Sequence, residues 1–86
     1  MEDRNYMEVG MVPYQNLSGY SGVAAYGIGA DYILVQFDDD SIYLYTYESA
    51  GKEHIERMKG LALEGIDLNR YINQFVYKKY ARRWRD

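Results

Sequence analysis

The sequence contains no cysteine, one proline and one histidine, and it has no long apolar run. Without cysteine, the chain cannot form disulfides, thiolate zinc sites or a cysteine nucleophile. A lone histidine does not provide the several His or Cys ligands at fixed spacing that metal sites usually require. No apolar run approaches the roughly 20 residues that a membrane-spanning helix needs. We therefore expect no metal site and no membrane association.

Tyrosine is the unusual component of what is present, with 11 of 86 residues against 2 Phe and 1 Trp. The apolar fraction of 48% indicates a folded chain, because enough apolar surface is available for burial. The length allows a single domain over residues 1–86, near the size at which one core just sustains folding. Residues 1–5 are acidic and lack the apolar stretch of a signal peptide, so we expect a cytoplasmic protein.

Charge is distributed unevenly along the chain, although the formal net charge is only −3. Residues 1–69 carry a net −8, whereas residues 70–86 carry a net +5 from six cations and Asp86. Such asymmetry is typical of a basic interaction tail, but it also fits a solvated surface or attraction between the two halves. The six cations are Arg70, Lys78, Lys79, Arg82, Arg83 and Arg85.

Residues 32–37 and 42–47 are β-branched and aromatic runs with a period of two. The polar turn between them, residues 38–41, includes Asp40, which can adopt a left-handed conformation. This pattern predicts a β-hairpin, and a short strand at 23–26 would add the third strand that a hairpin needs for stability. Three tyrosines of the second run should share one face of the sheet: Tyr43, Tyr45 and Tyr47.

Two helices are expected after the hairpin. Ser49 can cap the first, and Gly65 can end it in a left-handed conformation, with Ile66 folding back onto the helix. Asp67 can cap the second helix, and Trp84 continues the four-residue spacing that predicts its buried side. The apolar stripe of this helix is Leu68, Tyr71, Ile72, Phe75, Val76 and Tyr80. The opposite, polar face is Asn69, Arg70, Asn73, Gln74, Lys78 and Arg82.

These patterns predict an α+β domain, in which a small antiparallel β-sheet, the hairpin plus a third strand, is packed by two C-terminal helices. Residues 1–14 are expected to be a loosely ordered lead-in, residues 20–47 the sheet and residues 50–84 the two helices.

Several motifs follow one another along residues 21–75: Ser21-Gly22-Val23, Tyr26-Gly27, Ile33-Leu34-Val35-Gln36-Phe37, Tyr43-Leu44-Tyr45, Gly65-Ile66-Asp67-Leu68-Asn69, Ile72-Asn73 and Phe75. Their order and spacing resemble the KTSC domain, named for its occurrence at the C-terminus of some lysyl-tRNA synthetases. This chain departs from that family at the turn glycine (Asp40), a later arginine (Asn73), the final tyrosine (Phe75) and a missing proline after the hairpin. The resemblance implies a sheet-plus-helix fold and an accessory role near nucleic acid, and it transfers no catalytic residues.

The residues themselves indicate no catalytic site and no cofactor. His54 lacks the partners of a metal or nucleophile site, and the acidic residues 38–40 are better explained as the hairpin turn. Gly27-Ile28-Gly29 leads into a strand, whereas a phosphate loop leads into a helix. Gly19-Tyr20-Ser21-Gly22 is one residue short of a nucleophile elbow. We therefore expect a protein that is not an enzyme.

The basic, aromatic C-terminal helix is the strongest functional signal. Cations attract phosphates, and aromatic rings stack on unpaired bases, so a contact with RNA or single-stranded DNA is one hypothesis. A protein–protein adaptor or homodimer is the alternative, with the tyrosines of the second hairpin strand exposed. An exposed Trp84 would favour nucleic acid, and an exposed tyrosine face would favour the adaptor. The candidate nucleic-acid-binding residues are Arg70, Lys78, Lys79, Arg82, Arg83 and Trp84.

Overall fold

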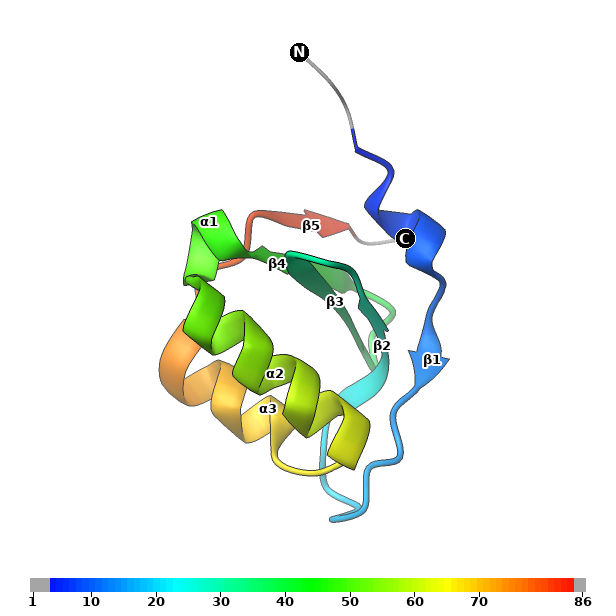
Figure 1. Cartoon of the computed structure of the whole chain (residues 1–86). Coiled ribbons are helices and arrows are strands. Elements are labelled where there is room, and N and C mark those ends of the chain that lie inside the picture. Colours follow the sequence, from blue (N-terminus) through cyan, green and yellow to red (C-terminus); the bar gives the residue numbers. More distant parts are fainter. Residues whose placement is uncertain (1–3, 85–86) are drawn as a thin grey trace.

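A computed structural model describes residues 4–84, so residues 1–3 of the expected lead-in and Arg85 and Asp86 of the basic tail lie outside it. Its strands form one antiparallel sheet, in which the spatial order β1-β2-β3-β4-β5 follows the order of the chain. Figure 1 shows the longest helix lying along one side of this sheet. The strands are β1 (Val12–Pro13), β2 (Val23–Ile28), β3 (Tyr32–Phe37), β4 (Ile42–Thr46) and β5 (Arg82–Trp84).

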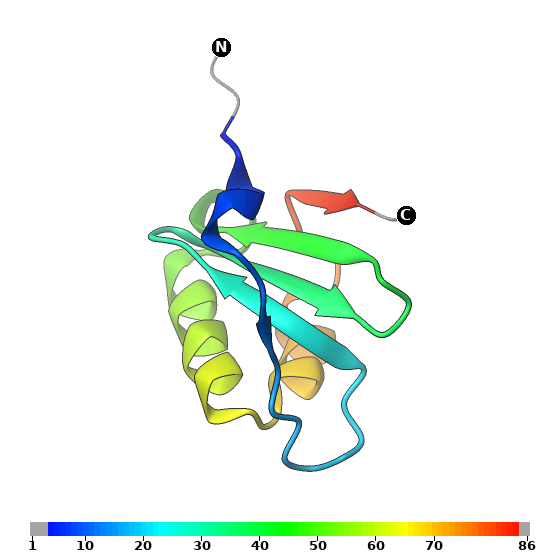
Figure 2. The same cartoon turned by 90° about the vertical axis from the view of Figure 1, so that its right-hand side faces the viewer.

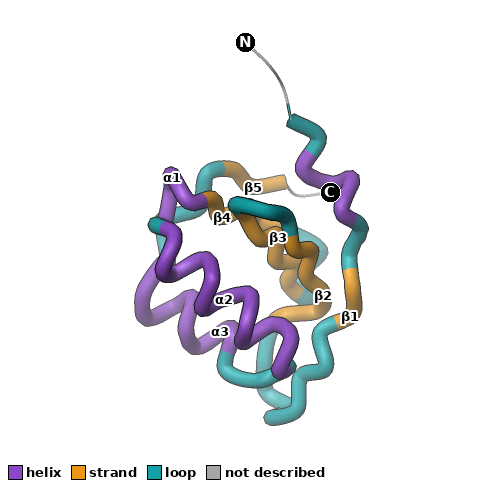
Figure 3. The backbone as a smooth tube through the Cα atoms, in the orientation of Figure 1, coloured by secondary structure: helices purple, strands orange, loops and turns teal. Residues whose placement is uncertain are grey.

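The helices are α1 (Tyr47–Ala50), α2 (Lys52–Glu64) and α3 (Leu68–Tyr71), which continues into the π-helical turn η2 (Ile72–Val76). A 3-10 turn, η1 (Tyr6–Val9), precedes the sheet. Figure 3 shows α2 and α3 side by side on the same side of the strands. The predicted α+β class is confirmed, with more strands than the three expected. No helix in the described residues is both long enough and apolar enough to cross a membrane.

The predicted hairpin and its third strand are present. Ile33 of β3 pairs with Tyr45 of β4, and β2 pairs with the other edge of β3. Asp40 has a φ of 70°, as the turn chemistry predicts, and its N–H donates to the carbonyl of Phe37 at 2.9 Å. The Asp39 carboxylate accepts from the Ser41 hydroxyl at 2.6 Å, which satisfies that buried hydroxyl.

The main core lies between the sheet and the helices. Tyr45 and Ile33 from the sheet belong to one buried cluster with Ile55 and Met58 of α2 and Leu68 of α3. Full burial of such side chains stabilises the fold by about 1.5–3 kcal/mol each. Tyr43 and Tyr45 of β4 share one face, as predicted, but that face points toward the helices: Tyr45 is 1% exposed and Tyr43 is half-buried. Tyr47 begins α1 and does not continue the strand, and it is half-buried against the same core.

The opposite face of the sheet is also covered. Tyr32, Leu34 and Leu44 form a second buried cluster, against which Tyr6 and Trp84 pack from the two ends of the chain. Figure 2 shows the N-terminal segment crossing in front of the sheet on this side. The expectation of a loosely ordered lead-in over residues 1–14 is therefore wrong for its described part, because apolar side chains on the second face need a cover.

Two expected helix caps differ in detail. The first predicted helix is α2, whose N-cap is Gly51 and which has no side-chain cap bond, so the prediction that Ser49 caps it is wrong. Ser49 lies within the preceding short helix α1, where the Thr46 hydroxyl accepts from the Ser49 N–H at 3.0 Å and Ser49 Oγ accepts from the Thr46 N–H at 3.0 Å. This reciprocal pair is a capping box, in which Ser49 occupies the third helical position. Asp67 stands at the N-cap of α3 but makes no side-chain cap bond, because its backbone is left-handed. Gly65 ends α2 with a φ of 75°, as predicted.

The second helix does not extend to residue 84. It ends at Val76, the chain turns, and Arg82–Trp84 pair with β4 as the strand β5. The Ala81 N–H donates to the Leu44 carbonyl at 2.7 Å and begins this pairing. The free edge of β4 supplies the physical reason, because unpaired strand N–H and C=O groups favour the addition of another strand. The four-residue spacing of Val76, Tyr80 and Trp84 therefore gave a wrong helix prediction.

Candidate functional site

The strand β5 divides the basic tail between the two faces of the sheet. Arg83 lies opposite Tyr43, whereas Arg82 lies opposite Leu44. Neighbouring residues of a strand point to opposite faces, so Arg83 lies on the helix side and Arg82 lies on the outer side with Trp84. The Arg82 guanidinium is 4.9 Å from the centre of the Trp84 ring, and that ring packs half-buried against the outer cluster. The six predicted residues therefore do not form one surface.

A hollow of about 380 Å³ opens on the helix side, between the β3–β4 turn, β5 and the α3–η2 helix. We call it the aromatic groove. Its polar lining consists of Asp39, Ser41, Asn69, Asn73, Lys78 and Arg83. Its apolar and aromatic lining consists of Phe37, Tyr43, Tyr45, Ile72, Tyr77 and Tyr80.

The rings of the groove hold one another in place. Tyr43 packs edge-on against Phe37 at a centroid distance of 5.2 Å and against Tyr80 at 5.0 Å. Tyr45 stacks nearly parallel to Tyr43 at 6.4 Å. Such edge-to-face and stacked pairs add about 0.5–1.5 kcal/mol each beyond area burial. The floor of the groove is therefore preformed, while Tyr77 at its rim is 61% exposed.

Protonation keeps the groove neutral at its floor and cationic at its rim. Burial raises the pKa of Tyr45 far above its ordinary value, so this hydroxyl stays protonated. Hydrogen bonding to Tyr43 raises the pKa of Arg83, whose guanidinium lies 5.9 Å from the centre of that ring. Lys78 Nζ is 6.0 Å from the centre of the Tyr77 ring. Asp39 is the single acidic side chain in the lining, so the local balance is positive.

The structure brings only Lys78 and Arg83 of the predicted residues into the groove. Lys79 is exposed in the turn after η2, outside the groove. Arg70 lies on α3, with a guanidinium nitrogen 3.9 Å from the Asp67 carboxylate and a side chain that is 70% exposed. Its place is a neighbouring hollow rather than the groove itself.

The sequence reasoning missed several groove residues. Asn69, Asn73 and Lys78 did appear together on the expected polar face of the second helix, so the helical spacing carried part of the signal. Phe37 and Tyr43 were assigned only to the hairpin. No local pattern shows that the end of a hairpin will meet residues of a later helix, because that meeting is set by tertiary packing.

No group of three or more His, Asp or Glu side chains that could hold a metal ion occurs within residues 4–84. His54 lies instead beside Tyr71, with its Nδ1 atom 2.7 Å from the tyrosine hydroxyl. Phe75 completes this small cluster on the outer surface of the helices, with its ring centre 4.6 Å from that of Tyr71. The described residues therefore place the one histidine in a hydrogen-bonded aromatic contact.

Comparisons of the chain with protein-family models, with curated proteins and with solved structures found no match. The resemblance to the KTSC domain therefore stays a prediction made from the motifs in the sequence.

Proposed function

We propose that this protein is a non-catalytic binding module that holds single-stranded RNA or DNA in the aromatic groove. The observation that carries the proposal is the combination of exposed aromatic and cationic side chains around one preformed hollow. Single-stranded nucleic acids are bound in grooves of this kind, where rings stack on bases and cations neutralise the backbone. The resemblance to the KTSC domain supports the same direction.

Each part of the groove has a distinct role in this proposal. The exposed ring of Tyr77 stacks on a base, and Arg83 and Lys78 contact the adjoining phosphates. The side-chain amides of Asn69 and Asn73 offer donors and acceptors to base edges and sugar hydroxyls. The volume of about 380 Å³ falls in the range of small ligand pockets, which suits one nucleotide held at a time.

The alternative function is a protein adaptor that binds its partner through exposed tyrosines of the second hairpin strand. That alternative requires Tyr43, Tyr45 and Tyr47 to be exposed, but Tyr45 is buried and the other two are half-buried against the core. A protein partner would have to use a different surface. Trp84 is half-buried on the outer face, so the exposed Trp84 that would favour nucleic acid is not found, and the exposed ring beside a cation in the groove is that of Tyr77.

A fluorescence-anisotropy titration with labelled oligo-U and oligo-dT tests the proposal at about 50 mM salt and upward, because phosphate contacts weaken as salt rises. Lys78→Ala should weaken binding and reduce the slope of log K against log salt by about 0.7, the loss of one phosphate contact on a single strand. Tyr77→Ala should cost about 1–3 kcal/mol and leave the slope unchanged, because stacking releases no counterions.

Lys79→Ala is the matched control, because Lys79 is an exposed cation that adjoins Lys78 in the chain but lies outside the groove. It should change both affinity and slope less than Lys78→Ala. Thermal unfolding of each variant checks that the fold is kept. Absence of binding at low salt, or equal losses in the Lys78 and Lys79 variants, would overturn the assignment of the groove.

A further inference from the structure

A second hollow of about 350 Å³ adjoins the aromatic groove. Asn69 and Asn73 line both, so the two form one continuous track across the start of α3 and η2. The far side of the second hollow comes from the loop before β2, through Ser18, Tyr20 and Ser21. The polar surface therefore extends well beyond the space that a single nucleotide would occupy.

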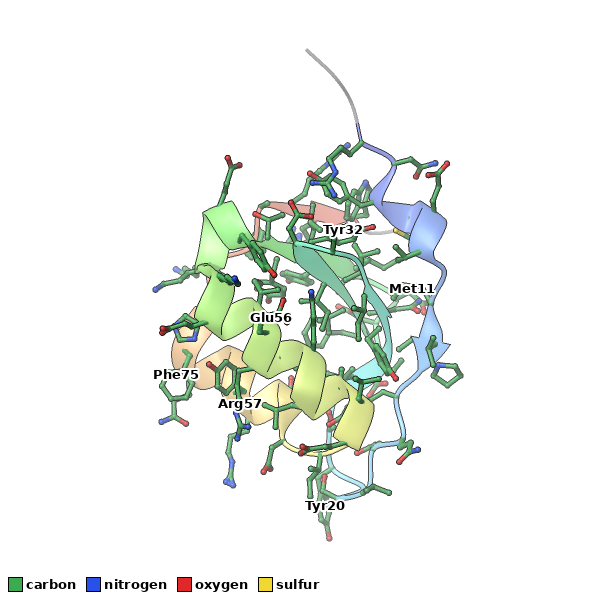
Figure 4. All side chains as sticks on the ribbon, in the orientation of Figure 1. Met11, Tyr20, Tyr32, Glu56, Arg57 and Phe75 are labelled. Atoms are coloured by element: carbon green, nitrogen blue, oxygen red, sulfur yellow. The ribbon has the colours of Figure 1, made fainter. Side chains whose placement is uncertain are left out.

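Tyr20 stands at the far end of this track with its side chain 93% exposed. Figure 4 shows it projecting from the tip of its loop, away from the body of the domain. No ring pair involving Tyr20 is present among the described residues. An aromatic ring held fully in water has large apolar area available for contact, and its entropic cost of immobilisation is small.

The loop that carries Tyr20 is nevertheless well anchored. The Leu17 N–H donates to the Gly65 carbonyl at 2.8 Å, which ties the loop to the end of α2. Within the loop, Asn16 accepts from the Gly19 N–H at 3.0 Å and, through its side chain, from the Ser21 N–H at 3.1 Å. The backbone that carries Tyr20 is thus held in a hydrogen-bonded turn, from which the side chain extends into solvent.

Arg70 lines the same second hollow as Tyr20. Its contact with Asp67 is long, at 3.9 Å, and both side chains are more than half exposed. An exposed ion pair of this geometry holds the guanidinium weakly, so Arg70 can turn toward a phosphate. Asp67 also lines this hollow.

We propose that the second hollow is a further subsite for the same single strand, in which Tyr20 stacks on a base and Arg70 contacts a phosphate. This inference rests on the proposed function of the aromatic groove and extends it. A strand bound in the groove would continue over Asn69 and Asn73 and reach Tyr20 only when it is several nucleotides long. The protein would then bind long strands more tightly than short ones, through residues that short strands never contact.

Anisotropy titrations with oligo-U and oligo-dT of about 4 and about 12 nucleotides test this, since single-strand binding sites span about 4–16 nucleotides. Tyr20→Ala should weaken binding of the longer strand by about 5- to 150-fold, the loss expected for one base stack, and leave the shorter strand unaffected. Tyr20→Phe should bind like the unaltered protein, because it keeps the ring face. Arg70→Ala should likewise affect only the longer strand and should reduce its salt slope.

Leu17→Ala is the control, because Leu17 is exposed in the same loop but does not line the hollow. It should leave both affinities unchanged. Binding of both strands with no effect of Tyr20→Ala on the longer one would overturn the second subsite and leave the groove standing. Equal losses for both lengths would also overturn it, because Tyr20 would then act on the groove. No binding of either strand at low salt would overturn both proposals.

Discussion

The two faces of the sheet are both buried, but they are covered by different kinds of structure. The helix face packs against α2 and α3, and its cluster includes Ile55, Met58 and Leu68, each with no exposed surface. Among the described residues, 4–84, the outer face is covered by the N-terminal segment, residues 4–13, and by Trp84. Regular helices cover one side, and the two chain ends cover the other.

The two covering layers should differ in how easily they open. Several buried residues of α2 and α3 would have to leave the core together before the helix layer could open, so it belongs to the stable part of the domain. The N-terminal segment makes fewer buried contacts: half-buried Tyr6 lies edge-on to Tyr32 at 4.9 Å, and Arg4 pairs with Asp31 at the surface. We therefore expect the outer layer to open at a lower free energy than the helix layer.

The largest effect is expected in the helix layer. Ile55→Ala removes a fully buried side chain from the face of α2 that meets the sheet. The variant should lose about 2–5 kcal/mol of unfolding free energy, a large share of the stability of a domain this small. Denaturant unfolding followed by circular dichroism measures the loss. Leu63→Ala, in the same helix but with a 64% exposed side chain, should stay within about 0.5 kcal/mol of the unaltered protein.

An intermediate effect is expected where the N-terminal segment crosses the sheet. A Cβ added at Gly27 would lie 2.9 Å from the Gly10 carbonyl oxygen and 2.9 Å from Val9 Cγ2. Gly27→Ala should therefore displace the segment and cost about 1–3 kcal/mol, the usual range for overpacking. Hydrogen exchange should rise in residues 4–13 while α2 stays protected.

Gly22→Ala provides the comparison for this substitution, because a Cβ at Gly22 meets nothing within 4 Å and its φ is not in the left-handed region. It should leave hydrogen exchange of the N-terminal segment unchanged. If Gly27→Ala raised exchange in α2 as much as in residues 4–13, the two layers would open as one unit and the contrast between them would be wrong.

The covered outer face shows how far the sequence could predict the fold. The residues Tyr32, Ile33, Leu34 and Val35 are all buried, and such an unbroken apolar run is typical of a strand covered on both faces. The period-two pattern identified the hairpin correctly. It could not show that Tyr6 would cover the other face, because that contact joins residues far apart in the chain.

The candidate site was predictable in part for the same reason. Asn69 and Asn73 were correctly placed on one polar face because the helix that sets their spacing continues as far as Val76, whereas Lys78 lies in the turn after it. Beyond that point Tyr80 and Trp84 have the spacing of a helix, but residues 82–84 pair with the free edge of β4 and form a strand. Because these residues form a strand and not a helix, Arg82 and Trp84 lie on the outer face, whereas Arg83 lines the groove. Local patterns give residue types and spacing, whereas strand pairing decides which side of the sheet receives them.

The smallest effect on stability is expected at the ion pair between Arg4 and Asp31, which links the N-terminal segment to the turn between β2 and β3. Both guanidinium nitrogens of Arg4 donate to the Asp31 carboxylate, at 3.0 and 2.9 Å, and these hydrogen bonds hold the pKa of Asp31 below its ordinary value. A carboxylate with a lowered pKa in the folded state stabilises the fold at pH values above its unfolded pKa of about 4, and this contribution is lost as the pH falls through the lower, folded value. Acid should therefore loosen the segment first.

Hydrogen exchange of residues 4–13 checks this prediction, after correction for the intrinsic pH dependence of exchange. Protection should decrease below about pH 4 in the unaltered protein, whereas Asp31→Asn should show weak protection already at neutral pH and no further acid step. Global unfolding should change little, because the two side chains are 46% and 42% exposed and exposed pairs contribute little to stability. Glu64→Gln, which removes an exposed carboxylate at the end of α2, should leave the acid step in place. An acid step that persists in Asp31→Asn would show that another carboxylate fastens the segment, and the outer layer would then not depend on this pair.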